Sequence, residues 1–428
     1  MIADRQFNIP LPTAFARCGF VGVACLIVAV FCYEAARVGW TTEQVGATDM
    51  KKVHAALVLD PNNPKLHNWA GILELFGNEV EPGDAIREFR TAADLNPRSA
   101  QYWANLGHAC YIASDISCGK AAYDKAVAAA PHSPRVLNEA ASFDLVTENT
   151  DDALPELRRL LEIDPSSASS ALTMGLRALP PEVLWQSVVR DQHEPSVKLE
   201  YFELLSTQGM NEVAQRLWGE FVSSGPSLHL DTAKPYLAAM ESQHDYADMA
   251  RVWRDLERLH AGGMPARTLG NLIVNPRFEN APSNIGLDWH VPDEQFIEAQ
   301  VVKTPDCGNA LEVDYTVPNN AESEPGYQRV PVVPGQKYEI RALVRSAEIT
   351  SDSGPVLRVT DPACAECISS KTEPTTGTTD WHEIASTFTA GATTDMVRVS
   401  IWRARSRVFP PEIRGQFWIR DVELTETK

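Results

Sequence analysis

Basic residues are scarce in this chain of 428 residues. It carries 38 Lys and Arg against 57 Asp and Glu, which gives a formal net charge of −19 at pH 7. A field of this sign repels the phosphate backbone from which nucleic-acid-binding proteins draw most of their affinity. With 44% hydrophobic and 22% charged residues, the composition is that of a globular protein rather than a disordered one. We therefore expect no nucleic acid among its partners.

Recognised catalytic motifs are also missing. The sequence has no glycine-rich phosphate-binding loop, no His-Glu-x-x-His helix and no Gly-x-Ser-x-Gly turn. The segments described below leave no stretch for a further catalytic domain, so we expect a protein that is not an enzyme and holds no organic cofactor. An unrecognised hydrolase remains the alternative, because a sequence does not show which carboxylates meet in space.

Only one stretch is apolar enough for a bilayer, Cys18 to Tyr33. As a helix its 16 residues span about 24 Å, slightly less than the roughly 30 Å hydrocarbon core, and snorkelling of Arg17 and Glu34 closes the gap. We interpret residues 18–36 as an uncleaved transmembrane anchor after a short tail, residues 1–17. A cleaved secretory signal is the alternative, although Tyr33-Glu34-Ala35 is a poor cleavage pattern.

The charges beside this anchor do not orient it. Two arginines, Arg5 and Arg17, precede it, and Arg37, Lys51 and Lys52 follow it. We expect a single-pass membrane protein whose soluble domains lie in the periplasm or another extracytoplasmic space.

Five cysteines lie outside the apolar stretch: Cys110, Cys118, Cys307, Cys364 and Cys367. Their odd number leaves at least one unpaired. Cys110 and Cys118 either pair or remain small buried thiols. Near the C-terminus a disulfide is favoured over a zinc site made of Cys307, Cys364, Cys367 and His382, because nothing in the spacing requires the metal.

Prolines recur at a regular interval after the anchor. Pro61, Pro97, Pro131 and Pro165 each follow an apolar helical segment, at spacings of 36, 34 and 34 residues. Small residues stand at fixed offsets from these prolines and let two antiparallel helices approach closely: Ala56, Ala92, Ala126, Ala85, Gly119, Ala153, Gly71, Gly107 and Ala141.

This pattern resembles the tetratricopeptide repeat, a pair of helices with a period of 34. The copy that matches best carries Trp103, Leu106, Gly107, Tyr123, Ala126 and Pro131. The resemblance implies an all-α solenoid over residues 42–260. We expect an orphan helix from Thr42 to Leu59, three repeats from Asp60 to Pro165, and two degenerate hairpins, Pro195 to Ser223 and Thr232 to Leu259.

Stacked hairpins of this kind leave a concave groove lined by the first helix of each pair. In repeats of this family that clasp peptides, asparagines and basic side chains hold the ligand, so the resemblance implies a protein partner. The positions expected to face the groove are Lys65, Asn68, Gln101, His108, Tyr111, Arg135 and Asn138. The alternative is that these side chains form only the solvated face of amphipathic helices.

Helical periodicity stops at residues 261–267, a Gly- and Pro-containing linker. Short alternating segments follow, which predict an all-β sandwich over residues 268–428. The expected strands are Ala310 to Val317, Gln336 to Arg345, Pro355 to Val359, Trp381 to Phe388, Met396 to Trp402 and Gln416 to Leu424.

Several segments of this region resemble, in order, the jelly-roll carbohydrate-binding modules appended to xylanases and glucanases. They include Asn271 to Asn275, Ala310 to Val313, Pro334 to Tyr338 and Phe417 to Leu424. The resemblance implies polysaccharide binding. Sugar rings stack their C–H faces on flat aromatic side chains, and their hydroxyls need polar partners nearby.

Parity along the strands indicates which rings are available. From Met396 to Trp402, Val397, Val399 and Ile401 share the core face, so Trp402 shares the outer face with Arg398. Tyr338 aligns with core residues. We expect the carbohydrate site to consist of Trp402, Trp289, Tyr327, Arg398, Arg403 and Arg405.

Modules of this family commonly hold a structural calcium ion, and Glu279 and Asp421 match those positions. Asp421 also breaks the alternation of its strand, as a β-bulge would. The alternative for both carboxylates is a solvated edge position.

Together these features predict a non-catalytic, membrane-anchored scaffold of the bacterial cell envelope. Its helical repeats dock a partner protein and its jelly roll binds polysaccharide, in exopolysaccharide assembly or export. The alternative is a protein–protein adaptor whose sandwich binds no sugar.

Overall fold

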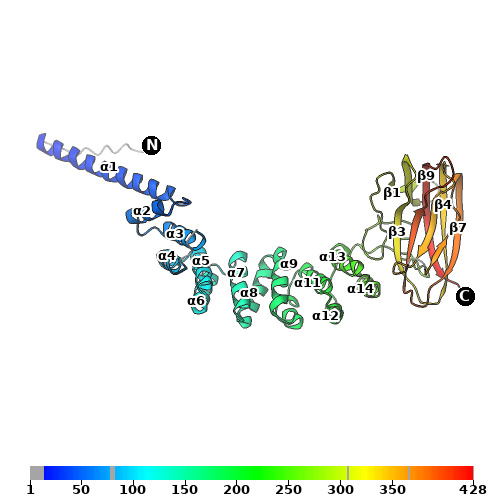
Figure 1. The fold of residues 1–428 in the computed structure, drawn as a ribbon, viewed down its shortest axis with the longest axis horizontal. Coiled ribbons are helices and arrows are strands. Elements are labelled where there is room, and N and C mark those ends of the chain that lie inside the picture. The colour runs from blue at the N-terminus through cyan, green and yellow to red at the C-terminus, as the bar shows by residue number, and fades with distance from the viewer. Residues whose placement is uncertain (1–13, 78–81, 306–307, 365–366, 428) are drawn as a thin grey trace, which may run out of the picture. The chain divides into compact units, whose positions relative to one another are not determined.

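The computed structural model describes residues 14–77, 82–305, 308–364 and 367–427. These described residues form two compact units, one made of those up to residue 167 with 174–180, and the other made of 168–173 with those from residue 181 onward. The expected fold class is confirmed: an apolar N-terminal helix, tetratricopeptide-like helical hairpins and a C-terminal antiparallel β-sandwich (Figure 1). The predicted tail, residues 1–17, lies largely outside the described part of the chain.

The first helix, α1 (Ala14–Glu43), carries the apolar stretch. Its segment Cys18–Glu43 is long and apolar enough to cross a membrane, and a secretory signal near the N-terminus meets the same criteria. Its side chains are exposed, Leu26 by 66% and Phe31 by 71%, which leaves an apolar surface for lipid.

The helix expected from Thr42 begins later than predicted, at Met50, as α2 (Met50–Leu59). Instead α1 continues through Thr42 to Glu43 and a turn follows. Gly46 in that turn has a φ of 103°, a conformation that only glycine adopts without strain. Asp49 then caps α2, its carboxylate accepting a hydrogen bond from the Lys51 N–H at 3.0 Å.

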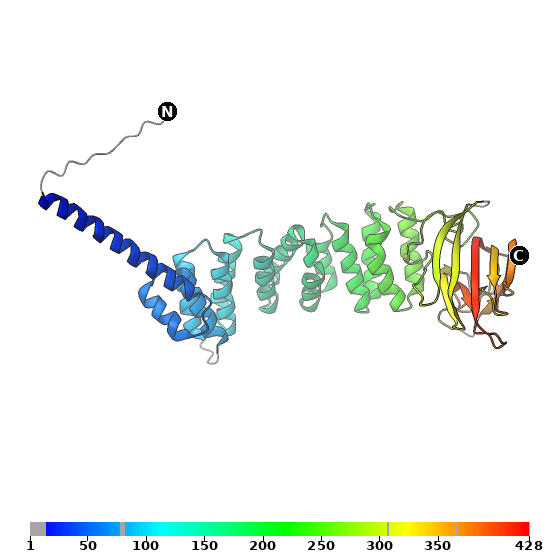
Figure 2. The ribbon, with the colours of Figure 1, turned by 90° about the horizontal axis from the view of Figure 1, so that it is seen from above.

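Three helical hairpins follow in the first unit (Figure 2). Each of the four recurring prolines comes directly after a helix or its C-cap residue and ends it, as expected. The pairs are α3 (Pro64–Phe76) with α4 (Pro82–Leu95), α5 (Ala100–Ile112) with α6 (Ile116–Ala129), and α7 (Pro134–Val146) with α8 (Thr150–Ile163).

The small residues of the repeat make room for aromatic rings. A methyl group on Gly107 would come within 2.7 Å of the Tyr123 ring, and one on Gly119 within 2.7 Å of the Phe143 ring. The Phe89 ring covers Gly71 in the same way. These positions therefore require glycine because the rings that fix the hairpins occupy the space of a side chain.

The second unit contains further helical elements. Two hairpins confirm the degenerate repeats, and their core holds the rings of Trp185, Phe202, Trp218 and Tyr236. The elements are α9 (Ala168–Ala178), which both units share, α10 (Pro181–Leu184), a π-turn at Trp185–Val189, α11 (Pro195–Thr207), α12 (Asn211–Ser223), α13 (Leu230–Ser242) and α14 (Tyr246–Arg258).

The residues predicted as a linker make contacts inside this second unit. Gly262 pairs with His229, Arg267 pairs with Val274, and Arg267 Nε lies 2.7 Å from a carboxylate oxygen of Glu257.

The sandwich consists of a five-stranded sheet, β1-β2-β9-β4-β7, and a four-stranded sheet, β3-β8-β5-β6. The strands are β1 (Glu298–Thr304), β2 (Gly308–Asn319), β3 (Ser323–Pro331), β4 (Lys337–Ile349), β5 (Val356–Thr360), β6 (Ser369–Lys371), β7 (Gly377–Thr389), β8 (Met396–Arg403) and β9 (Ile413–Glu426). All six predicted strands are present.

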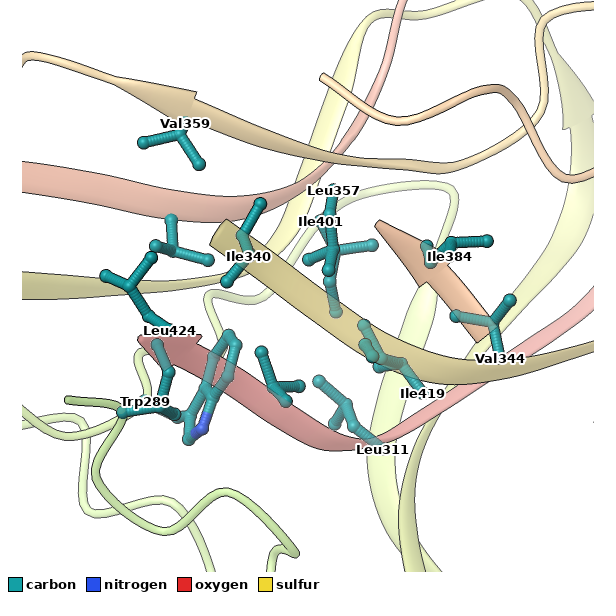
Figure 3. Packing of buried hydrophobic residues seen from close by; sticks show 14 of the residues in the cluster. Trp289, Leu311, Ile340, Val344, Leu357, Val359, Ile384, Ile401, Ile419 and Leu424 are labelled. Atoms are coloured by element: carbon teal, nitrogen blue, oxygen red, sulfur yellow. The ribbon is translucent and has the colours of Figure 1, made fainter. Parts of the chain in front are cut away.

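The two sheets enclose an apolar core, and Figure 3 labels Leu311, Ile340, Ile419 and Leu424 among its residues. Leu311 is the strand partner of Ile419, and Ile340 is that of Leu424. Tyr338 is fully buried, as its parity predicts. The pairing of β4 with β9 shifts register between Arg341 and Leu343, beside Asp421. Asp421 has a φ of 47°, which confirms the predicted bulge.

Candidate functional site

The first unit contains a cavity of about 420 Å³ against α5 and α7, with Tyr123 of α6 in its wall. Five of the seven predicted groove residues line it: Gln101, His108, Tyr111, Arg135 and Asn138. They come from the first helices of two successive hairpins, as the repeat geometry requires. Peptide binding by these residues stays a prediction, but their convergence on one cavity is a property of the fold.

A chain of side-chain hydrogen bonds crosses this groove. Arg135 of α7 donates to Gln101 of α5, and Gln101 donates to the Asn105 amide oxygen at 2.6 Å. Asn105 then donates to the Asn68 amide oxygen of α3 at 2.7 Å. The four side chains therefore form a polar ladder, a name kept below, that links the first helices of all three hairpins.

The predicted residues Asn68 and Lys65 lie at the α3 end of the groove. Asn68 does not line the cavity but joins it through the ladder. Lys65 is exposed in the first turn of α3, outside the cavity wall.

Sequence reasoning missed Asn105, Glu139 and Ser142, which also line the cavity. They stand eight or eleven residues after a repeat proline, whereas Gln101 and Arg135 stand four after. Residues at offsets of four, eight and eleven lie on one face of a helix. The helical period could therefore have predicted Asn105, Glu139 and Ser142 from the positions of Gln101 and Arg135.

The cavity also has an apolar part. Tyr111 meets Phe143 edge to face at a centroid distance of 6.0 Å, and Tyr123 lies 5.0 Å from Phe143. Burial raises the pKa of Tyr123, so its hydroxyl stays neutral. Val146 is 60% exposed at the cavity edge.

Arg135 is only partly free for a ligand. Its side chain is 55% exposed, and its Nε lies 3.4 Å from the Glu139 carboxylate. The cavity therefore presents a guanidinium whose charge is already balanced by a neighbour. Neutral peptide groups suit it better than an isolated carboxylate does.

The second candidate surface is the outer face of the four-stranded sheet. Trp402 and Arg398 of β8 lie on this face, which confirms their predicted parity, and Arg358 of β5 lies between them. Arg398 and Arg358 both bond Glu324, Arg358 at 3.2 Å. The two arginines therefore share one carboxylate, which offsets one of their two positive charges.

Trp402 is partly exposed and borders a cavity of about 270 Å³. The Arg358 guanidinium lies 4.3 Å from the indole centroid, and the indole N–H donates to Glu322 at 2.8 Å. The side chains of Arg405 and Lys371 border the same cavity. Two predicted sugar-binding residues, Trp402 and Arg405, are thus brought together.

The prediction that Trp289 offers its ring to a ligand is wrong. Its exposed fraction is 0%, and its ring packs 5.2 Å from that of Phe278. Figure 3 shows it among the core residues, near Leu424. Trp289 lies outside any regular strand, so parity gave no guide to its orientation.

The prediction that Arg403 is presented with Arg405 is also wrong. Arg403 has an exposed fraction of 0% and lies on the core side of β8, so it does not reach a surface site. Its guanidinium donates to the carbonyls of Ala321 at 2.6 Å, Ser353 at 3.1 Å and Pro411 at 3.2 Å. Burial lowers the pKa of Arg403 below its usual value.

Tyr327 is half-buried, and both faces of its ring are covered. The His290 ring stacks on it with a centroid distance of 4.8 Å and an interplanar angle of 6°. The Arg398 guanidinium lies 3.5 Å from the centroid of the Tyr327 ring. Two planar groups at these distances cannot share one ring face, so each takes one. A sugar ring has no face of Tyr327 left to stack on, which contradicts its predicted platform role.

The carboxylates proposed for calcium do not fit the ion. Asp421 lies 3.0 Å from Arg277 Nε and 2.6 Å from Arg420 Nη2, so two cations already balance it. Glu279 is exposed and lines a cavity with the same two arginines. Within the described ranges no group of three or more His, Cys, Asp or Glu is placed to hold a metal ion.

Two disulfides settle the pairing of four cysteines. Cys110 of α5 bonds Cys118 of α6, and Cys364 bonds Cys367. The second bond removes two thiolates from the zinc set considered above, and Cys307 lies outside the described residues.

The sequence matches no protein-family model and no curated protein. Among solved structures, one described as "CBM4 structure and function" is 14% identical, with 36% of this chain and 99% of that chain covered at a TM-score of 0.27. One described as "Functional Characterization of Pseudomonas Aeruginosa pilF" is 19% identical, with 53% of this chain and 93% of that chain covered at a TM-score of 0.30. The enzymatically active domain of tailspike protein 4 from bacteriophage CBA120 is 15% identical, with a TM-score of 0.27. The match covers 37% of this chain and 22% of that chain. None of these scores reaches 0.5, so none carries an argument about function.

Proposed function

We propose that this chain is a non-catalytic scaffold of the bacterial cell envelope, active in exopolysaccharide assembly or export. In this proposal α1 anchors it in a membrane, the groove of α3, α5 and α7 docks an extended segment of a partner protein, and the sandwich binds polysaccharide beside Trp402. The observation that carries the proposal is the cavity on which Gln101, His108, Tyr111, Arg135 and Asn138 converge.

The groove suits an extended peptide for two reasons. The amides of the polar ladder recur from one hairpin to the next, at the spacing of successive first helices. The exposed side chains of Tyr111 and Val146 supply an apolar surface in the same cavity. Backbone amides of a peptide would meet the ladder, and its side chains would meet this apolar surface.

Site-specific photo-cross-linking in cells that produce the full chain tests this docking. A photoreactive residue in place of His108 or Tyr111 is expected to give one discrete adduct with a partner. The same residue in place of Arg159, exposed on α8, is the control and is expected to give none. Adding Asn105→Ala should remove the adduct at His108. Equal adducts from all three positions, or none, would contradict docking in the groove.

Polysaccharide binding rests on the partly exposed Trp402 and the cavity beside it. Retention of the full chain on immobilised polysaccharides tests it, with the protein held in nanodiscs. Trp402→Ala is expected to weaken retention about tenfold, because stacking on an indole contributes on the order of 1 kcal/mol or more. Trp418→Ala, half-buried on β9 of the other sheet, is the matched control and is expected to retain wild-type binding.

The adaptor without sugar binding remains the second candidate. It predicts cross-linking in the groove and no retention on any polysaccharide. The non-catalytic assignment predicts that the purified chain releases no new reducing ends from a retained polysaccharide, and a steady release would overturn it.

A further inference from the structure

The cavity beside Trp402 differs in charge from the chain as a whole. Lys371, Arg405 and Arg407 line it, whereas Asp352 is the single acidic side chain in its wall. The Asp352 carboxylate also accepts a hydrogen bond from Ser406 Oγ at 2.5 Å. In a chain of net charge −19, this is a local excess of positive charge.

The three cations are available to a ligand, and Lys371 Nζ lies 5.9 Å from the Trp402 ring centroid. Within the described part of the chain, the side chains of Lys371, Arg405 and Arg407 form no ion pair, and all three residues are exposed. The arginines elsewhere on this face, Arg358 and Arg398, are held by Glu324. Glu324 thus offsets one of the two charges on the sheet, whereas the cations at the cavity have no ion-pair partner among the described residues.

Arg403 adds charge behind the cavity wall. Its hydrogen-bond acceptors are neutral oxygens, the carbonyls named above with the Asn320 amide and the Ser351 hydroxyl, and none is a carboxylate. Its Nε bonds the carbonyl of Ser353, which lines the cavity. The Asp352 carboxylate also acts on this guanidinium, but all of the Arg403 hydrogen bonds go to neutral groups, and a buried charge acts more strongly than one in water.

We propose that this cavity binds the carboxylate of a uronic acid residue in an acidic polysaccharide, with a sugar ring against Trp402. The inference rests on the proposed polysaccharide binding and narrows it to one class of ligand. Guanidinium groups match a carboxylate in charge and in the geometry of their N–H donors. The indole supplies the apolar contact that a simple anion does not use.

Polygalacturonate and its fully methyl-esterified form provide the test, because they share one backbone and differ in charge. The full chain in nanodiscs is expected to bind the acid at least tenfold more tightly than the ester. The double variant Arg405→Gln/Arg407→Gln is expected to lose most of that difference. The control Lys337→Gln/Arg414→Gln removes two exposed charges elsewhere on the sandwich and is expected to change binding by less than twofold.

The outcomes separate the two proposals. Equal affinity for acid and ester overturns the inference and leaves polysaccharide binding intact. No retention of acid, ester or a neutral glucan overturns both. Dextran sulfate and polyphosphate distinguish a sugar site from a general anion site: if both bind as tightly as polygalacturonate, and Trp402→Ala changes nothing, the cavity holds anions only and the inference fails.

Discussion

At the scale of single residues, Arg403 organises one end of the sandwich. Its guanidinium bonds carbonyls from three loops that lie far apart in sequence, at Ala321, Ser353 and Pro411. Replacing it removes the donors and leaves buried carbonyls unpaired, each at a cost of about 1–3 kcal/mol.

We therefore expect Arg403→Met to lower the free energy of unfolding of the sandwich by about 3 kcal/mol. Amide hydrogen exchange should rise in residues 351–353 and 404–411 before it rises elsewhere in the sheets. Arg414→Met, at an exposed position, is the control and should leave both quantities unchanged. Unaltered exchange in the two loops would show that Arg403 does not hold them.

Glycine positions in the helices give a second residue-scale prediction. Gly107→Ala and Gly119→Ala each place a methyl group within 2.7 Å of a ring and should destabilise by about 1–3 kcal/mol. Gly219→Ala in α12 meets no atom within 4 Å and should stabilise by about 0.5–1 kcal/mol, because alanine favours a helix. Urea unfolding of the full chain measures all three, and the same sign throughout would contradict the packing.

Residue-level predictions succeeded where a regular period applied. Trp402 and Tyr338 lie on strands, so alternation placed both correctly. Trp289 lies in an irregular segment, where no period constrains a ring. The prediction for Arg403 was wrong for another reason. Its core position depends on hydrogen-bond acceptors that distant loops bring together, and a local sequence pattern gives no information about those loops.

At the scale of elements, the hairpin of α3 and α4 carries a pH-dependent contact. Glu74 of α3 is 11% exposed, and one of its buried oxygens lacks a hydrogen-bond partner. Burial, with the nearby charges of Glu88 and Asp84, raises the pKa of Glu74 from 4.5 to about 7. The cost of ionising it is absent below pH 4.5 and complete above about pH 7.

Glu74→Gln removes that cost. We expect it to leave stability unchanged at pH 4 and to raise it by about 2 kcal/mol at pH 8. Hydrogen exchange in α3 and α4 of the full chain, compared at the two pH values, measures the difference. The exposed Glu148→Gln is the control. Equal stabilisation at both values would mean that the gain does not come from ionisation.

Elements were predicted well where the sequence repeats. The proline interval and the small residues predicted three hairpins. The small residues recur because aromatic rings occupy the space beside Gly71, Gly107 and Gly119. The strands β1, β3 and β6 were not predicted. β6 has three residues, too few for a pattern, and β3 contains Pro325 and Gly326, which read as a turn.

At the scale of the whole molecule, the disulfides bear on where the chain lies. Disulfides persist in oxidising compartments and are rare in the cytosol. If both units lie outside the cytoplasm, Cys110, Cys118, Cys364 and Cys367 stay oxidised in cells, whereas the three cysteines of α1 remain thiols.

Maleimide mass tagging of the protein, denatured straight from cells, tests this arrangement. We expect four additional tags after reduction, and a variant with Cys110→Ser and Cys118→Ser should gain only two. Tagging of all four cysteines before reduction would place them in a reducing compartment and contradict the proposed orientation.

The polar ladder has a consequence for the energetics of docking. Its amides on α3 and α5 and the guanidinium of Arg135 on α7 already bond one another, so a peptide that bonds to them exchanges existing hydrogen bonds for new ones at little net enthalpy. The driving force then comes from water released by the exposed side chains of Tyr111 and Val146. Calorimetry of such a complex should show a negative change in heat capacity and affinity that weakens on cooling.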